Sequence, residues 1–208
     1  MELKKRNCSI IAEIETNNSY YEVFIDFGDR KIEFKVSKLL GDKIGEFVSA
    51  LYTLYHEGED FHGEWHHKYQ FDNNNQITAT TTEIDWDSEG HILTIQMTKM
   101  VDDATIFIRT TEDYGRNWDS FSVDGRDFCY AIGKACTKAL KKYGFYGFQC
   151  GMEYIRAVPS AIIIHQLLFI KAYGLGNMET RELINFNDIP YCYKTNFEKE
   201  LELLLFDM

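Results

Sequence analysis

Histidine and carboxylate side chains are concentrated between residues 56 and 67 of the sequence. The segment contains His56, Glu57, Glu59, Asp60, His62, Glu64, His66 and His67. If a strand already runs through it, His62, Glu64 and His66 face the same way, because alternate residues of a strand share a face. Imidazole and carboxylate groups are good ligands for zinc or non-haem iron. Gly63 weakens the strand assignment and no fourth ligand can be named. We therefore expect no resident metal or cofactor, and keep a metal-dependent enzyme or metal-binding protein as an alternative.

A second acidic segment imitates the start of a calcium-binding loop. Asp85, Asp87 and Glu89 take its first, third and fifth places, and Gly90 takes the sixth. The twelfth place, where such a loop needs a bidentate glutamate, holds Gln96. The sequence therefore predicts a tight hairpin turn here and no calcium site.

The sequence contains no motif for nucleophilic catalysis or phosphate binding. G-x-S-x-G, H-E-x-x-H, G-x-x-x-x-G-K-S/T and a G-x-G-x-x-G after a strand are all missing. Cys129 and Cys136 lie seven residues apart on one predicted helix, and we expect both to be small buried apolar residues. We interpret His165, within an apolar segment, as a core histidine. These observations predict a protein that is not an enzyme.

Composition excludes several classes of protein. The 208 residues include 22 Lys and Arg against 33 Asp and Glu, a net charge of −11. A general nucleic-acid binder needs clustered cations, so nucleic acid is not an expected partner. The most apolar run, residues 161–170, is about half of the ~20 residues that a membrane span needs. The five cysteines form no C-x-x-C pair, and no apolar segment of signal-peptide length is found. We expect a cytoplasmic protein that does not bind membranes.

Hydrophobic alternation predicts most of the strands. Residues 20–27 and 31–36 alternate on either side of Gly28-Asp29, which is typical of a hairpin with a two-residue turn. An alternating run at residues 8–15 precedes them. Four more runs, at residues 65–71, 76–84, 91–99 and 105–111, are separated by short polar turns. Such turns leave no room for parallel crossovers, so the sheet is predicted to be antiparallel.

Apolar residues at three- and four-residue steps predict the helices. One runs over residues 42–56, with Asp42 as its N-cap and Gly58 as its stop. The next begins at Asp124 or Asp127 and is expected to end at Gly144. Its outer face carries the only strong basic patch, which can be explained by the helix dipole alone; the patch consists of Lys134, Lys138, Lys141 and Lys142. Further helices are expected over residues 161–173 and from residue 196.

These elements predict an α+β fold. We expect an antiparallel sheet meander of six or seven strands, with the amphipathic helices packed on one face. No linker divides the chain. Residues 1–155 are predicted to form the core, and residues 156–208 a C-terminal helical extension packed on it, in a single domain overall.

Aromatic residues are abundant for a core of this size. The chain has 15 Phe, 13 Tyr and 3 Trp. Several of the Tyr and Trp residues lie near expected strand ends or turns, beside carboxylates, as Tyr20 and Tyr21 do. Rings supply contact area and carboxylates steer a basic partner, so we predict a protein-binding surface. Its predicted residues are Trp65, Tyr69, Asp85, Trp86, Asp87, Glu89, Tyr114 and Trp118. The alternative is that the rings pack on the sheet and the charge only maintains solubility.

The order of these features resembles a family of bacterial proteins. Phe47-Val48-x-x-Leu51 lies on the first helix, before the meander, and Trp86-Asp87-Ser88-Glu89-Gly90 and a loop with Trp118 follow. The next helix runs from Phe128 to Tyr143-Gly144-Phe145-Tyr146-Gly147. Over about residues 20–148 the chain looks like the small acidic α+β immunity proteins found beside polymorphic and contact-dependent toxins. The resemblance implies an inhibitor that binds a cognate toxin domain and has no catalysis of its own. It assigns no individual binding residue.

The sequence thus predicts a non-catalytic, acidic binding protein that neutralises a basic toxin domain. Two alternatives remain open. One is the metal-dependent protein that uses His62, Glu64 and His66. The other is an adaptor or structural protein that dimerises through an exposed sheet edge. Monomer and dimer are both compatible with the sequence.

Overall fold

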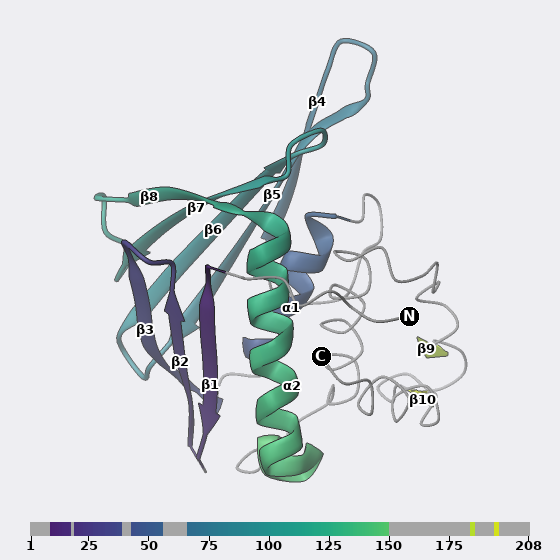
Figure 1. Ribbon diagram of the computed structural model, residues 1–208. Helices are drawn as coiled ribbons and strands as arrows, with labels where there is room; N and C mark the ends of the chain where they lie inside the picture. The colour runs from purple at the N-terminus through teal and green to yellow at the C-terminus, as the bar shows by residue number, and fades with distance from the viewer. Residues whose placement is uncertain are drawn as a thin grey trace.

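Three antiparallel sheets, of three, five and two strands, and two helices are present in the described part of the chain (Figure 1). The computed structural model describes residues 9–17, 19–38, 43–55 and 66–149, together with residues 184–185 and 194–195. The strands are β1 (Ile11–Thr16), β2 (Tyr20–Asp26), β3 (Lys31–Ser37), β4 (His66–Phe71), β5 (Ile77–Asp87), β6 (Ile92–Met100), β7 (Thr105–Glu112), β8 (Asp119–Asp124), β9 (Ile184–Asn185) and β10 (Lys194–Thr195). The helices are α1 (Lys43–Thr53) and α2 (Gly125–Gln149). The α+β fold class is confirmed.

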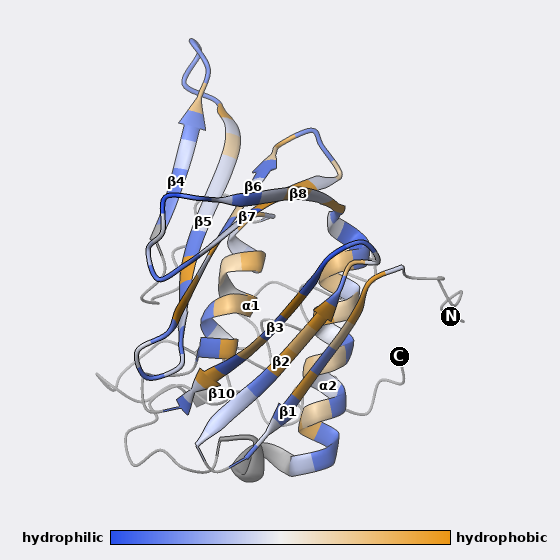
Figure 2. Cartoon of the chain, turned by 90° about the vertical axis from the view of Figure 1, so that its left-hand side faces the viewer, coloured by the Kyte–Doolittle hydropathy of each residue, from blue (hydrophilic) through white to orange (hydrophobic). Residues whose placement is uncertain are grey.

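The first sheet has the order β1-β2-β3. The predicted hairpin is confirmed: Gly28 has a φ of 96°, and the Phe27 N–H donates to the Arg30 carbonyl at 2.9 Å. A positive φ at the first turn residue is the reason that glycine suits this place. Alternate residues Tyr21, Val23 and Ile25 are buried, and the alternation is visible as bands along β2 and β3 in Figure 2.

The second sheet has the order β4-β5-β6-β7-β8. It is a pure meander, as predicted, and its β4–β5 hairpin projects from the molecule (Figures 1 and 2). The inner face of the sheet carries buried Ile84, Trp86, Ile95 and Met97. A pure meander forms here because each connection is only a few residues long and carries residues that accept tight turns, such as Asn75 with a φ of 62°.

The helices cover the inner faces of the strands. α1 packs against β5, and α2 packs against β1 and β8; in Figure 2, α1 is seen between the two sheets. Asp124 caps α2, since its carboxylate accepts the Asp127 backbone N–H at 2.9 Å. Two lysines of the basic patch pair with β1: Lys138 with Glu13 at 3.4 Å and Lys142 with Glu15 at 2.6 Å. The patch is therefore partly neutralised within the molecule.

Three details of the prediction are wrong. The expected single sheet of six or seven strands is instead divided into separate sheets of three and five strands, and β8 is a strand that the sequence pattern does not predict. β8 ends at Asp124 and α2 begins at Gly125, so no separate turn segment marks the end of the strand. α2 continues past Gly144, since a glycine inside a helix costs only about 1 kcal/mol.

Other predictions concern residues outside the described part. These are the capping role of Asp42, the stop at Gly58, the helices at residues 161–173 and from residue 196, and the extension over residues 156–208 apart from β9 and β10. The role of His165 belongs with them.

Candidate partner-binding site

Two connections of the five-stranded sheet meet and bring carboxylates together. One is the β5–β6 turn and the other is the start of the β7–β8 connection, where the Asp113 N–H donates to the Ile92 carbonyl at 2.8 Å. Glu89 (φ 57°), Asp113 (φ 48°) and Tyr114 (φ 54°) adopt left-handed backbone conformations, which the reversals of the chain require. We call this region the acidic end; it consists of Asp85, Asp87, Glu89, Glu112 and Asp113.

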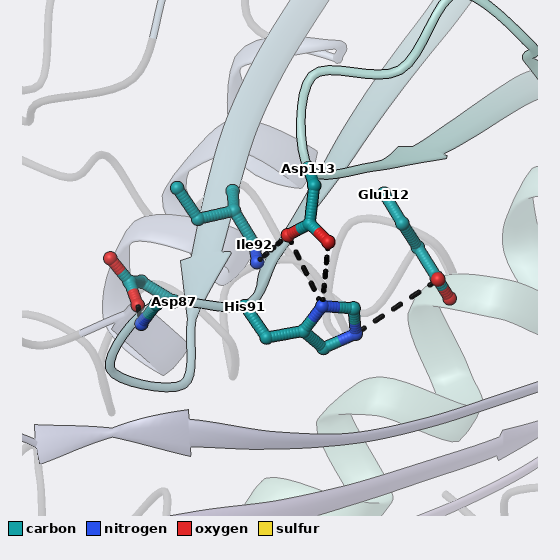
Figure 3. A network of polar contacts seen from close by, with 6 residues as sticks. Asp87, His91, Ile92, Glu112 and Asp113 are labelled. Carbon is teal, nitrogen blue, oxygen red and sulfur yellow. Dashed lines mark hydrogen bonds and ion pairs between the residues drawn. The ribbon is translucent and has the colours of Figure 1, made fainter.

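His91 lies among these carboxylates (Figure 3). Its Nδ1 lies 3.1 Å from each Asp113 oxygen, and its Nε2 lies 3.9 Å from Glu112. Asp113 also accepts the Ile92 backbone N–H at 2.9 Å. These contacts, first the Ile92 N–H and then His91, hold the pKa of Asp113 below its usual value. Asp113 therefore stays charged and fixes the start of β6 against the end of β7.

Tyr114 is the exposed ring of the acidic end. Its side chain is 66% exposed, and its hydroxyl donates to Asp85 at 3.3 Å. Asp85 accepts a second hydrogen bond from the Thr94 hydroxyl at 2.6 Å. The charge of Asp85 raises the pKa of Tyr114, so the phenol keeps its proton and remains a donor. This arrangement offers a flat, amphipathic ring held next to a carboxylate.

Glu89 has a structural role as well. Its carboxylate lies 3.3 Å from the Ser37 hydroxyl of β3, and a hydrogen bond with Glu89 raises the pKa of Tyr20. The ring of His91 lies 5.5 Å from that of Phe34, also on β3. The acidic end thus contacts β3 of the three-stranded sheet through Glu89 and His91.

A cleft of about 550 Å³ runs beside the acidic end. Residues 31–34 of β3 line one side of it, and residues 110–112 and 115–117 line the other, with Leu93 between them. The lining includes the carboxylates of Glu33 and Glu112 and the guanidinium of Arg116. The volume lies within the roughly 300–1,000 Å³ of typical binding pockets.

The structure brings together only part of the predicted binding surface. Asp85, Asp87, Glu89 and Tyr114 meet at the acidic end. Trp118 is half-buried on the outer face of the same sheet, with the Arg109 guanidinium 4.7 Å from its ring centroid. Because Trp118 is stacked in this way, it offers less free ring than Tyr114 does.

Other predicted anchors fail or lie elsewhere. Trp86 is 0% exposed and Tyr21 is 2% exposed, so the prediction that these rings lie on the surface is wrong. Alternation decides this, since residues 82, 84 and 86 all face the core. Tyr69 lies on β4 opposite Thr80, towards the far end of the sheet, and is not part of the acidic end. Trp65 is outside the described residues.

Candidate metal ligands are not brought together within the described residues, where no group of three or more His, Cys, Asp or Glu side chains has a metal-binding arrangement. His66 begins β4, whereas His62 and Glu64 lie outside the described part. The metal alternative therefore stays a prediction. Asp85 and Asp87 lie at the end of β5, and Glu89 lies in the predicted hairpin turn, where Asp87 accepts the Gly90 N–H at 3.1 Å.

The two described cysteines lie away from this site. Cys129 and Cys136 are 1% and 2% exposed, as predicted, and burial raises the pKa of the Cys129 thiol to about 12. Neither thiol lines the cleft. Both pack in the core beneath the sheets.

Sequence reasoning missed His91, Asp113 and Glu33 as members of this region. His91 and Asp113 are 22 positions apart, and only the β6–β7 register brings them together. The sequence gives one indication of the role of Asp113, since an Asp between two strands often accepts backbone N–H groups in a turn. It gives no indication for Glu33, which alternates with apolar residues as any exposed strand residue does.

Comparisons with known proteins identify no relative. No protein-family model, curated protein or solved structure matches this chain. No helix in the described part of the chain has the length and apolarity that a membrane crossing requires.

Proposed function

We propose that this chain is a non-catalytic protein that binds a basic protein partner at the acidic end and thereby neutralises it. The observation that carries the proposal is the cluster of carboxylates around the exposed ring of Tyr114. Clustered charge of one sign raises the association rate of an opposite charge, and an exposed tyrosine is a common anchor of interfaces. The net charge of −11 adds long-range attraction in the same sense.

The partner that we propose is a bacterial toxin domain. The support is the resemblance to immunity proteins over about residues 20–148, together with the missing catalytic motifs. An inhibitor of this kind needs only a rigid, complementary surface. The hydrogen bonds that attach Asp113 to β6 and Glu89 to β3 supply such rigidity.

The test is co-expression with a basic toxin domain encoded by a neighbouring gene. We expect the wild-type chain to restore growth and to bind the purified domain with a dissociation constant that rises with salt. A wild-type chain that neither restores growth nor binds any such neighbour would contradict the proposal.

Variants locate the surface. Tyr114→Ala is expected to weaken binding by about tenfold or more, as truncation of a central aromatic anchor does. Glu112→Gln is expected mainly to slow association. Asp102→Asn is the matched control, because it removes one exposed carboxylate from the β6–β7 turn, at the other end of the same sheet. An equal loss with Asp102→Asn would place the partner elsewhere.

A further inference from the structure

The outer edge of β3 presents backbone groups that no described residue satisfies. The Phe27 N–H donates to Arg30 at 2.9 Å, and the Lys38 N–H donates to Ser19 at 2.9 Å. Hydrogen-bonded and non-hydrogen-bonded residue pairs alternate along an antiparallel ladder, so these two bonds show which pairs of β2 and β3 are hydrogen-bonded. Even-numbered residues of β3 therefore face β2, and the N–H and C=O groups of Lys31, Glu33 and Lys35 face away from it. In the described part of the chain, no hydrogen bond reaches these groups.

The cleft beside the acidic end runs along this edge. Its lining includes Ile32 and Phe34 from the inner face of β3 and Lys31 and Glu33 from the outer face, but no residue of β2. A groove that touches both faces of one strand and avoids its neighbour follows the free edge. An extended chain placed there would continue the three-stranded sheet.

Charges on β3 indicate what such a chain carries. Lys31 pairs with Asp26 at 3.2 Å, and Lys35 pairs with Glu22 at 3.2 Å, both across the β2–β3 ladder. Glu33 lies opposite Phe24 and has no ion pair with a described residue. A residue added opposite Glu33 would therefore meet an uncompensated carboxylate. The residues on either side of it would face Ile32 and Phe34.

We propose that β3 binds an extended segment of the partner by strand addition, with a lysine or arginine opposite Glu33 and an apolar residue on each side. This inference rests on the proposed function and names the part of the partner that enters the cleft. A second copy of the chain fits less well, because the β7–β8 connection bounds the far side of the cleft.

The probe is a synthetic peptide, acetyl-Gly-Thr-Val-Lys-Val-Thr-Gly-amide, titrated into the ¹⁵N-labelled full chain. We expect saturable amide shifts at Lys31, Glu33 and Lys35, slower hydrogen exchange at these amides, and a dissociation constant in the millimolar range or below. Two control peptides match it. One has Glu in place of Lys, and the other is N-methylated at the Lys, which removes one donor without changing charge.

Two substitutions of Glu33 separate the backbone from the charge. Glu33→Pro removes an outward N–H and no ladder bond, which an edge strand tolerates, and we expect binding about tenfold weaker. Glu33→Gln keeps the N–H and removes the charge, and we expect a loss of about two- to fivefold. Thermal unfolding checks that each variant folds, and the N-methylated peptide tests the backbone bonds on the wild-type chain.

Each outcome decides the inference. The inference is overturned if the parent peptide does not bind, or if the N-methylated peptide binds equally well. It is also overturned if the amide shifts are confined to the acidic end, or if the chain forms a dimer whose formation the peptide inhibits. The co-expression assay separates this failure from that of the proposed function. If wild type and Glu33→Pro restore growth equally, strand addition is wrong and the proposed function stands. If the wild-type chain neither restores growth nor binds the toxin domain, the proposed function is wrong whatever the peptide does.

Discussion

At the scale of single residues, Trp86 joins parts of the molecule that are distant in sequence. Its ring lies 5.0 Å from that of Phe47 on α1 and 6.5 Å from that of Phe34 on β3, and it is 0% exposed. Its indole N–H has no hydrogen-bond acceptor among the described residues. The residue therefore contributes packing and aromatic contact between both sheets and a helix, and no polar contact.

Replacement of Trp86 tests this role. Trp86→Ala is expected to lower the free energy of unfolding by about 3–5 kcal/mol, because a large buried ring is lost and a cavity remains. Trp86→Phe keeps much of the packing and removes the unpaired N–H, so its cost is expected to be well under half of that. Urea denaturation measures both. A Trp86→Ala variant as stable as the wild type would mean that Trp86 is not in the core.

Asp85 is the residue that orients Tyr114. Asp85→Asn keeps the size of the side chain but removes the charge that raises the pKa of the Tyr114 phenol. We expect that pKa to fall towards the ordinary value of about 10. An ultraviolet titration of the phenolate measures it. Asp102→Asn, in the β6–β7 turn, should leave the titration unchanged, and an unchanged titration in Asp85→Asn would show that Asp85 does not act on the ring.

At the scale of elements, the start of α2 depends on a close approach. The Gly125 N–H donates to the Ala104 carbonyl at 2.8 Å, and a Cβ on Gly125 would lie 2.8 Å from that same oxygen and against the Tyr55 hydroxyl. Tyr55 is held in place by burial, which also raises its pKa. Alanine for glycine in a helix normally stabilises by about 0.5–1 kcal/mol. At Gly125 the clash is with a backbone oxygen, which cannot move away as a flexible side chain can. Alanine is therefore expected to destabilise the fold here.

Gly125→Ala is therefore expected to lower the melting temperature. The matched comparison is Gly125→Ala in a Tyr55→Phe background, which removes the hydroxyl clash and retains the one with the Ala104 carbonyl. We expect the double variant to be destabilised less by the added Cβ than the single variant is. A melting temperature raised by Gly125→Ala would contradict the close approach.

Local patterns account for most of these elements and for little of the site. The β2–β3 hairpin, the meander and both helices follow from alternation, three- to four-residue spacing and turn residues. β8 is not predicted by these patterns, because its six residues lead directly into α2. The acidic end was predicted in part, since Asp85, Asp87 and Glu89 are neighbours in sequence. The contribution of Asp113, the burial of Trp86 and the edge beside Glu33 depend on strand register and on packing between sheets, which a local pattern does not contain.

At the scale of the whole molecule, carboxylates add polar contacts between elements that are distant in sequence. Glu15 of β1 accepts from Lys142 and Tyr143 of α2, Asp119 of β8 pairs with Arg30 beside the β2–β3 turn, and Asp113 fixes β6. Hydrogen bonds and cations lower the pKa of each: Lys142 above all for Glu15, Arg30 for Asp119, and the Ile92 N–H for Asp113. Ionised carboxylates thus link β1 to α2 through Glu15, and β8 to the β2–β3 turn through Asp119.

The stability of the fold is therefore expected to decrease as the pH is lowered into the acidic range. A carboxyl group with a lowered pKa binds protons less readily in the folded chain than in the unfolded chain, so stability increases with pH across its titration. The contribution is complete above the unfolded pKa values of about 4 and is lost as pH falls through the lower folded values.

We expect a nearly constant melting temperature from about pH 5 to 7 and a progressive fall below about pH 4. Asp119→Asn and Glu15→Gln should each lower stability at pH 7 and flatten the acid limb, whereas Asp102→Asn should leave its slope unchanged. An acid limb with the same slope in all three variants would show that Arg30 and Lys142 do not stabilise the charged forms of their partners.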